Sequence, residues 1–131
     1  MSVDLRVNVP NRPGALVGAL QVLLDAGVEV LAASADNRPG ERWSYIHVLT
    51  DHAEAGRKAF EAAHIEVTGE HEVALREIEA HRGVLVELFN EYSSKGDNIE
   101  VLYMAPDGRW VIGTESMRRE RRGLRVDEAT Y

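Results

Sequence analysis

The chain has 131 residues, of which 44% are hydrophobic and 28% are charged, and its formal net charge is −7 at pH 7. This size fits one compact globular domain or two very small ones. The lack of cysteine excludes a disulfide framework and thiolate chemistry. No apolar run is long enough for a signal peptide or a membrane span, so we expect a cytoplasmic protein without membrane contact. The acidic charge disfavours nucleic acid, and the basic cluster at residues 118–122 fits a solvated helix face.

The first part of the chain alternates strand and helix patterns. Leu5, Val7 and Val9 alternate with polar residues, as in a half-buried strand. Helical spacing of apolar residues follows at 16–24, and Gly27 is placed to end that helix in a left-handed conformation. The other elements expected here are strands at 28–35 and 43–50 joined as a hairpin, a helix at 52–63 capped by Asp51, and a short strand at 65–67.

The rest of the chain repeats this βαββαβ order in a shortened form. We expect strands at 73–78, 98–104 and 110–114, a helix at 84–94 ended by Gly96, a helix at 116–122 and an edge strand at 124–126. Residues 127–131 fit a loose tail. The two units meet near Gly69, so the predicted division is a first repeat at 1–69 and a second, contracted repeat at 70–131.

The two parts also match residue by residue. Gly14-Ala15-Leu16-Val17 is followed sixty-nine residues later by Gly83-Val84-Leu85-Val86. Downstream the spacing shortens, and Gly40-Glu41-Arg42-Trp43 answers Gly108-Arg109-Trp110, which predicts a shorter hairpin turn. One duplication explains this pattern. At the spacing of sixty-nine, the matched pairs are Leu20 with Phe89, Leu23 with Tyr92, Gly27 with Gly96, and Val30 with Ile99.

The clearest binding chemistry lies in the segment Val9-Pro10-Asn11-Arg12-Pro13-Gly14-Ala15-Leu16, between the first strand and the first helix. Arg12 precedes a proline and is therefore extended, and Pro13 presets a helical φ at the first turn. Gly14 has no Cβ and lets a ligand or another backbone come close. The unpaired N–H groups of the following turn form a positive helix end suited to a carboxylate, although an ordinary well-capped helix start has the same pattern.

This pattern resembles the ACT domain family. The residues that carry the resemblance are Asn11-Arg12-Pro13-Gly14-x-Leu16, the glycine that ends the helix, and the Asn98-Ile99 start of a second strand. The resemblance covers nearly the whole chain as two copies. It implies an α+β fold of two ferredoxin-like repeats, with antiparallel sheets and helices on one face. It also implies a regulatory protein that binds amino acids or other small molecules between paired domains. The fold alone would not support this functional inference.

Carried over residue by residue, the resemblance implies two unequal sites. In the family, an Asn from the first loop of one domain and an Asn from the start of the second strand of its neighbour often hold the ligand. Asn11 and Asn98 match these positions, whereas the reciprocal pair is Ala80 and Glu29. Amides carry donors and acceptors for an ammonium and a carboxylate, although Asn98 also fits a plain turn residue. The predicted ligand-binding residues are Asn11, Arg12, Pro13, Gly14, Ala15, Leu16, Asn98 and Ile99.

Other candidates for chemistry are weaker. We expect no metal and no cofactor, and the histidines fit surface or strand positions, since none of them has a metal-type spacing with carboxylates. His81, in the loop of the second repeat, is the one placed for a pH-dependent role. No nucleophile or acid–base arrangement is visible, so we expect no enzyme activity. Trp43 and Trp110, at matching hairpin positions, are expected to pack. The histidines are His47, His52, His64, His71 and His81.

Two functions stay open on the sequence. The first is a regulatory amino-acid sensor that forms a homodimer. The alternative is a ligand-free oligomerisation or protein-interaction module, and the test between them is whether Asn11, Gly14 and Asn98 line a cavity. If the repeats pair edge to edge within one chain, Asn11 faces Asn98 there. Pairing between chains would move the same site to a homodimer interface.

Overall fold

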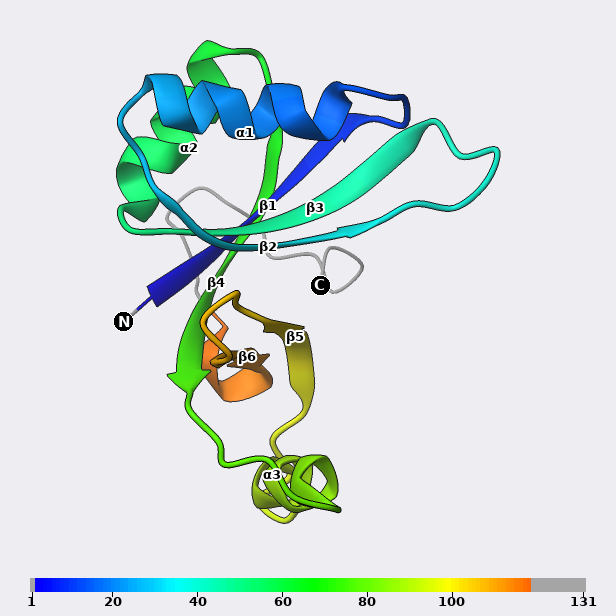
Figure 1. The fold of residues 1–131 in the computed structure, drawn as a ribbon, viewed down its shortest axis with the longest axis vertical. Coiled ribbons are helices and arrows are strands. Elements are labelled where there is room, and N and C mark those ends of the chain that lie inside the picture. Colours follow the sequence, from blue (N-terminus) through cyan, green and yellow to red (C-terminus); the bar gives the residue numbers. More distant parts are fainter. Residues whose placement is uncertain (1, 119–131) are drawn as a thin grey trace.

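The structure is a computed structural model, and it describes residues 2–118. Six strands form an antiparallel sheet in the order β2-β3-β1-β4-β6-β5, which confirms the predicted α+β class (Figure 1). No helix in this part of the chain is long and apolar enough to cross a membrane. The elements are β1 (Ser2–Pro10), α1 (Ala15–Asp25), β2 (Val30–Asp36), β3 (Trp43–Thr50), α2 (Ala53–Ala62), β4 (Val67–Arg76), α3 (Val84–Ser93), β5 (Ile99–Met104), β6 (Trp110–Thr114) and the 3₁₀ turn η1 (Glu115–Met117).

The first half of the sheet has the predicted βαββ order, and its two helices cover one face. Leu5 and Val7 on β1 are fully buried against α1 and α2, because alternate residues of a strand point to one side. Leu23 on α1 and Phe60 on α2 fill the same core. The alternate apolar residues of β1 therefore face the two helices, and the helices form a layer on that side of the strands.

Strand β4 joins the two halves. The sequence predicted separate strands at 65–67 and 73–78, but residues 67–76 form one strand that pairs with β1 through its first part and with β6 through its last. Gly69 does not end the strand, because the register shifts between Arg6 and Val7 where Gly69 pairs, and a bulge of this kind accommodates glycine. The predicted boundary near Gly69 lies inside β4, so the division into two repeats stays a prediction.

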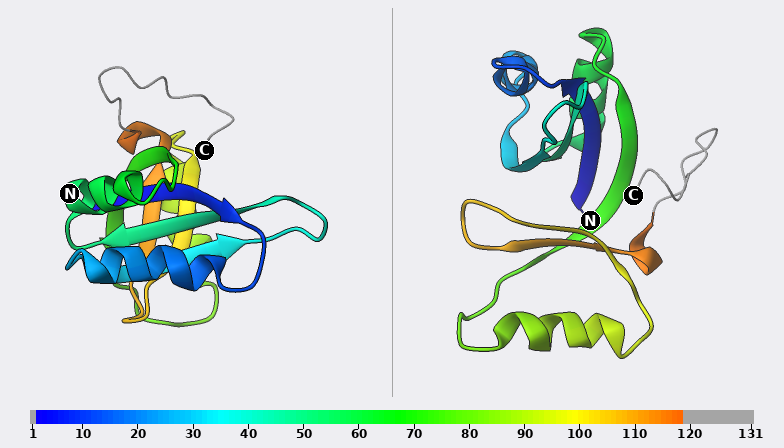
Figure 2. Two further views of the ribbon diagram at one scale, coloured as in Figure 1. Left: turned by 90° about the horizontal axis from the view of Figure 1, so that it is seen from above. Right: turned by 90° about the vertical axis from the view of Figure 1, so that its right-hand side faces the viewer.

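The sheet folds back on itself at β4, so its two halves lie face to face with the helices outside (Figures 1 and 2). β2 and β5 are opposite edges of the sheet, yet Ala32 of β2 and Val101 of β5 share one buried cluster. A hydrogen bond also crosses between the halves, because the Tyr103 hydroxyl donates to Asp4 Oδ1 at 2.6 Å. The packing between the halves is therefore partly apolar and partly polar.

The second half carries less helix than the first. α3 packs on β6 through Leu88, Tyr92 and Ile112. Of the predicted helix at 116–122, the structure shows the 3₁₀ turn η1 at 115–117, and residues 119–122 and the predicted strand at 124–126 lie outside the described residues. A three-residue 3₁₀ turn satisfies fewer backbone groups than a helix and covers less of the sheet.

Three local expectations are resolved by the side chains. His52, not Asp51, caps α2, because its Nδ1 accepts the N–H of Ala55 at 3.2 Å. Asp51 instead accepts the N–H of Glu29 through its Oδ1 at 3.0 Å, since it is closer to the start of β2. Trp110 packs beside α3 as predicted, but Trp43 is 44% exposed, so packing was the wrong expectation for the first tryptophan.

Candidate ligand site

The turn before α1 is built by Gly14. This residue has a φ of +87°, a left-handed conformation that an L side chain adopts only with strain. A Cβ placed on Gly14 would meet nothing within 4 Å, so the glycine is needed for its conformation and leaves open space in front of it. The helix begins at Ala15, so Pro13 lies in the turn that precedes the helix rather than in its first turn.

Asn11 fastens this turn to the β2–β3 hairpin. Its amide nitrogen Nδ2 donates to the carbonyl of Glu41 at 2.9 Å and to that of Arg38 at 3.3 Å. Its backbone N–H donates to the carbonyl of Arg42 at 2.9 Å. The donors of the amide are therefore occupied inside the chain, and Oδ1 is the group left for a ligand. The predicted double role of Asn11, as donor and acceptor, is reduced to that of an acceptor.

The N–H groups of Ala15 and Leu16 differ in whether they have an acceptor within the chain. Ala15 donates to the carbonyl of Arg12 at 3.2 Å, so its N–H is used within the turn. Among residues 2–118, the N–H of Leu16 donates to no backbone or side-chain acceptor. Of the two N–H groups predicted to face an anion, Leu16 is the one that remains available, as expected for the first turn of a helix.

A cavity of about 420 Å³ opens at this turn. Four of the predicted residues line it, namely Arg12, Pro13, Gly14 and Ala15, whereas Asn11 and Leu16 do not. The other walls come from α1, the end of β1 and the connection into β4, through Val9, Pro10, Gly18, Ala19 and Ile65. The volume lies in the range of small-molecule pockets.

Asn98 and Ile99 line a different cavity of about 360 Å³, at the end of α3 and the start of β5. The carbonyl of Asn98 accepts the N–H of Glu115 at 2.8 Å. The neighbouring Asp97 accepts hydrogen bonds from the hydroxyl of Ser116, the N–H of Ser116 and the hydroxyl of Thr114, at 2.7, 3.0 and 2.7 Å. These hydrogen bonds lower the pKa of Asp97, and the bond from the Ser116 hydroxyl has the largest effect. The same bonds hold the start of β5 to the segment at Thr114 and Ser116.

The structure does not bring Asn11 and Asn98 together within one chain. The two cavities share no lining residue. The repeats join through β1, β4 and β6, and the edges β2 and β5 stay unpaired in the described sheet, so edge-to-edge pairing of the repeats within one chain is not the arrangement observed. A shared site for both asparagines therefore requires a second chain.

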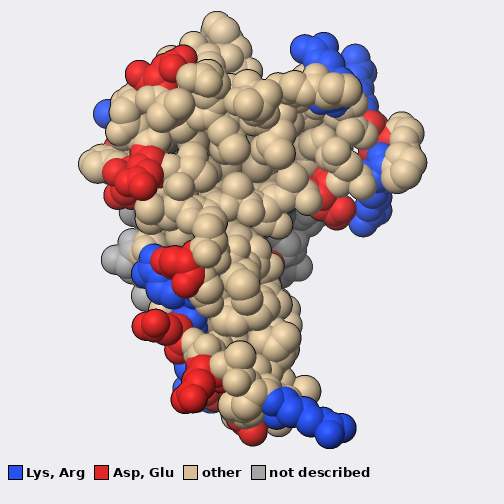
Figure 3. Space-filling model, viewed as in Figure 1, with Lys and Arg blue, Asp and Glu red and all other residues tan. Residues whose placement is uncertain are grey.

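The two ends carry different charge. Exposed Arg12, Arg38 and Arg42 lie on the turn before α1 and on the β2–β3 hairpin, where Figure 3 shows cationic side chains gathered at one corner of the molecule. The Asn98 end carries Asp97 among its cavity-lining residues, and Glu115 and Lys95 line the neighbouring hollow.

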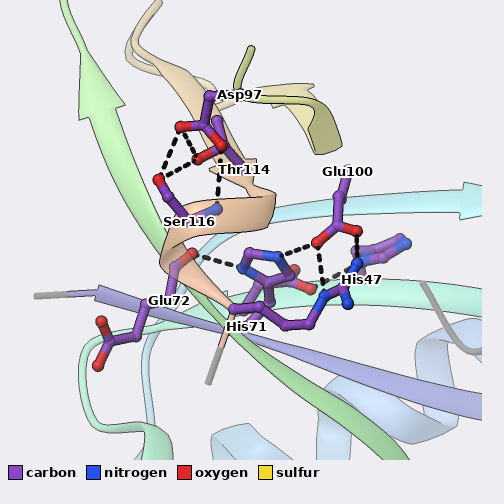
Figure 4. A network of polar contacts seen from close by, with 9 residues as sticks. His47, His71, Glu72, Asp97, Glu100, Thr114 and Ser116 are labelled. Carbon is purple, nitrogen blue, oxygen red and sulfur yellow. Dashed lines mark hydrogen bonds and ion pairs between the residues drawn. The ribbon is translucent and has the colours of Figure 1, made fainter. Parts of the chain in front are cut away.

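Sequence reasoning missed a buried polar cluster between the two halves, which includes His71, Glu100 and Asp4 (Figure 4). Strand alternation did place Asp4 on the side of β1 away from the helices, and that was the available signal. His81 is exposed and lies 3.3 Å from Glu87 at its Nε2. Within residues 2–118, no group of three or more His, Asp or Glu side chains is placed to hold a metal ion.

Comparisons by sequence find no matching family model and no matching curated protein. Solved structures do match. The chain is similar to protein BT0572 from Bacteroides thetaiotaomicron, with a TM-score of 0.74, 19% identity, and coverage of 87% of this chain and 79% of that chain. It is also similar to the ligand-free regulatory subunit of aspartate kinase from Thermus thermophilus, with a TM-score of 0.63, 16% identity, and coverage of 86% and 82%.

A third similar structure contains the alpha and beta subunits of an aspartokinase, with a TM-score of 0.58, 17% identity, and coverage of 90% of each chain. At these identities the likeness is one of fold. The chain thus shares its α+β fold with aspartate kinase regulatory subunits, as the resemblance implied.

Proposed function

We propose that this chain is a cytoplasmic regulatory module that binds a small ligand, an amino acid, at the turn before α1. The cavity of about 420 Å³ at Arg12–Ala15 is the observation that carries the proposal. Its lining contains four of the residues whose chemistry predicts ligand binding, namely Arg12, Pro13, Gly14 and Ala15. The regulatory role of the aspartate kinase subunits with this fold supports the proposal by analogy.

The groups at this turn suit the two ends of an amino acid. Arg12 lines the cavity, and a guanidinium can pair with a carboxylate through two parallel hydrogen bonds. The N–H of Leu16 lies at the positive end of α1 and adds a second donor. Asn11 Oδ1 is an acceptor for an ammonium group, since its Nδ2 is already occupied. None of these groups is placed as an acid or base, so the proposed role is regulatory rather than catalytic.

In this proposal a second copy completes the site. Among residues 2–118, β2 and β5 are unpaired edges and every strand pairing is antiparallel. Antiparallel pairing of β2 with β5 of the second copy would set the start of β5, with Asn98, opposite the end of β2. The end of β2 leads into the hairpin that Asn11 holds. Asn98 of the second copy would thus reach the turn that Asn98 of the same chain does not reach.

The outer faces of the helices support pairing between copies. Leu16 and its duplicate Leu85 are 41% and 38% exposed, and Val17 and its duplicate Val86 are 65% and 68% exposed. Large apolar side chains exposed at equivalent positions of both repeats indicate a face that is covered in an assembly. The same observation favours the second candidate function, a module that only assembles, so ligand binding has to be measured directly.

The test is a screen of the free protein against the twenty amino acids by thermal shift, followed by calorimetric titration. A ligand at one hundred times its dissociation constant adds about 2.7 kcal/mol to the free energy of unfolding, a shift of several degrees. We expect one or a few amino acids to give this shift. A dimer that shows neither heat nor stabilisation with any amino acid at millimolar concentration would leave the assembly module as the function.

A further inference from the structure

A cluster of buried ionisable groups joins the two halves of the sheet. His71 of β4 is fully buried, and the side chain of Glu100 of β5 is 5% exposed. Arg118, which follows η1, donates to both carboxylate oxygens of Glu100. Figure 4 shows the His71 ring between the main chain of its own strand and Glu100. Burial of charge is costly unless each group is paired, so the protonation of this cluster is constrained by its geometry.

Both ring nitrogens of His71 face acceptors. Nδ1 lies 2.6 Å from the carbonyl oxygen of Glu72, and Nε2 lies 3.0 Å from Glu100 Oε1. A neutral imidazole has one N–H donor, so it satisfies one of these contacts and sets a lone pair against the other acceptor. Only the doubly protonated ring donates to both.

The other way to satisfy both contacts is a protonated Glu100 that donates to a neutral His71. Arg118 opposes this, because its guanidinium donates to both oxygens of Glu100 and leaves the carboxylate little room for a proton. The same contacts, with that of Arg118 the largest, lower the pKa of Glu100. Glu100 is therefore the ionised partner, and the proton lies on the imidazole.

The charges of the cluster lead to the same assignment. Asp4 pairs across the strands with His71, and its fully buried carboxylate accepts from the Tyr103 hydroxyl at 2.6 Å and lies 2.8 Å from Nδ1 of His47. Two carboxylates, Asp4 and Glu100, thus lie with Arg118 in the space between the halves. A doubly protonated His71 adds positive charge beside these two carboxylates, which stabilises them in the interior.

The ring has no room to turn away. A Cβ built on Gly113 of β6 would lie 2.9 Å from Nδ1 of His71, which is closer than real Cβ atoms approach. The φ of Gly113 is not in the left-handed region, so the glycine is explained by this close approach and by that of the Val101 side chain at 3.2 Å. Among residues 2–118, the charged groups on the His71 side are Asp4 from β1, Glu100 from β5 and Arg118, with His47 of β3 behind Asp4.

We infer that His71 donates from both ring nitrogens and so latches the second half of the sheet to the first, and that this latch holds the start of β5. Glu100 is two residues beyond Asn98, and Arg118 is two residues beyond Ser116, which is bonded to Asp97. Both segments that hold Asn98 therefore end in the latch. The latch stands on its own contacts, whereas its role in regulating a ligand site rests on the proposed function.

The direct test is the ¹⁵N NMR spectrum of the imidazole rings of the ligand-free protein at pH 7. We expect both nitrogens of His71 to show imidazolium shifts, and exposed His81 serves as the internal comparison. A neutral tautomer of His71 at pH 7 would overturn the inference. This experiment uses the unmodified chain, so it does not depend on how a variant folds.

The coupling to β5 is read from the amide signals of Asn98 and Ile99 in the ligand-free protein at pH 7. We expect both signals to move in His71→Gln, which removes the ring, and to stay in place in His81→Gln. Gly113→Ala, which displaces the ring, should move the same two signals. Amide signals of Asn98 and Ile99 that stay in place in His71→Gln and Gly113→Ala would overturn the coupling. Absence of any amino-acid ligand would instead overturn only the proposed function.

Discussion

The two halves of the sheet share a backbone design and differ in the side chains placed on it. Gly14 and Gly83 precede α1 and α3 with φ values of +87° and +84°, and Gly27 and Gly96 follow these helices at +75° and +69°. The glycines thus preserve the turns in both copies. Asn11 ties the first turn to its hairpin, whereas Ala80 stands at the equivalent position of the second turn and has no side chain to do so.

The strand starts show the same relation. The carbonyl of Glu29 accepts the N–H of Asp51 at 3.1 Å, and the carbonyl of Asn98 accepts the N–H of Glu115 at 2.8 Å. The main chain is therefore held alike in both copies, while one start presents a carboxylate and the other an amide. The comparison teaches that the two halves share one backbone scaffold, and that the proposed binding chemistry depends on the few side chains that differ between them.

The largest expected effect tests α2, the helix that has no counterpart in the second half among residues 2–118. Phe60→Ala removes the fully buried anchor of α2 and should lower the free energy of unfolding by about 3–5 kcal/mol. Phe89→Ala on α3 is the comparison and should cost less, because Phe89 is only partly buried. Urea unfolding of both variants measures the difference. Equal costs would show that the two helical layers contribute alike.

The next effect concerns the diverged asparagines. Asn11→Ala and Asn98→Ala should each weaken amino-acid binding by about 1–3 kcal/mol, because each leaves a polar group of the ligand unpaired. The double variant should lose less than the sum if both hold one ligand. Glu29→Ala and His81→Ala are the controls and should change little. Isothermal titration measures all of them, and equal sensitivity at Glu29 and Asn98 would contradict the unequal sites.

A matched pair of glycine variants separates backbone strain from binding. Gly14→Ala and Gly83→Ala place a Cβ in open space at nearly the same positive φ, so both should destabilise the protein by about 1–2 kcal/mol. Only Gly14→Ala should also reduce the thermal shift produced by the amino acid, since only Gly14 lines the cavity of the first turn. An equal loss of ligand response in Gly83→Ala would move the site away from the first turn.

The smallest effect is pH-dependent and tests the Asp97 end. Hydrogen bonds from Ser116 and Thr114 lower the pKa of this carboxyl group, so the ionised form stabilises the fold. That stabilisation is present above the pKa of the unfolded chain and is lost as the pH falls through the lower folded pKa. Asp97→Asn should therefore be less stable than the wild type at pH 7 and approach it in acid. A stability difference that does not change with pH would contradict this role.

Much of the fold follows from the sequence because its signals are local. Alternation placed Leu5 and Val7 on the buried side of β1, and helical spacing with a terminal glycine placed α1 and α3 within one or two residues. The continuity of β4 could not be predicted from the sequence, because a glycine such as Gly69 is common both at strand ends and at bulges. Only the pairing of Gly69 with β1 distinguishes the two.

The sequence singled out residues that line a cavity, but it did not predict how far apart Asn11 and Asn98 lie within one chain. Arg12 to Ala15 line a cavity because the turn is set by local residues, whereas the distance from Asn11 to Asn98 depends on how the halves pack. The occupied amide of Asn11 was also beyond reach, since its acceptors lie in the hairpin about thirty residues away. His71 was missed because its partners come from three separate segments.

The central claim is that two chains build one site, and mixing the two asparagine variants tests it most directly. Asn11→Ala and Asn98→Ala are unfolded together in equal amounts and refolded, and binding of the amino acid found in the screen is measured by calorimetry, with the dimer mass checked by light scattering. In a mixed dimer, one chain supplies an intact turn and the other an intact strand start. Half of the dimers are mixed, so binding should return to about a quarter of the wild-type capacity at wild-type affinity. No recovery in a mixture shown to contain mixed dimers would contradict the account.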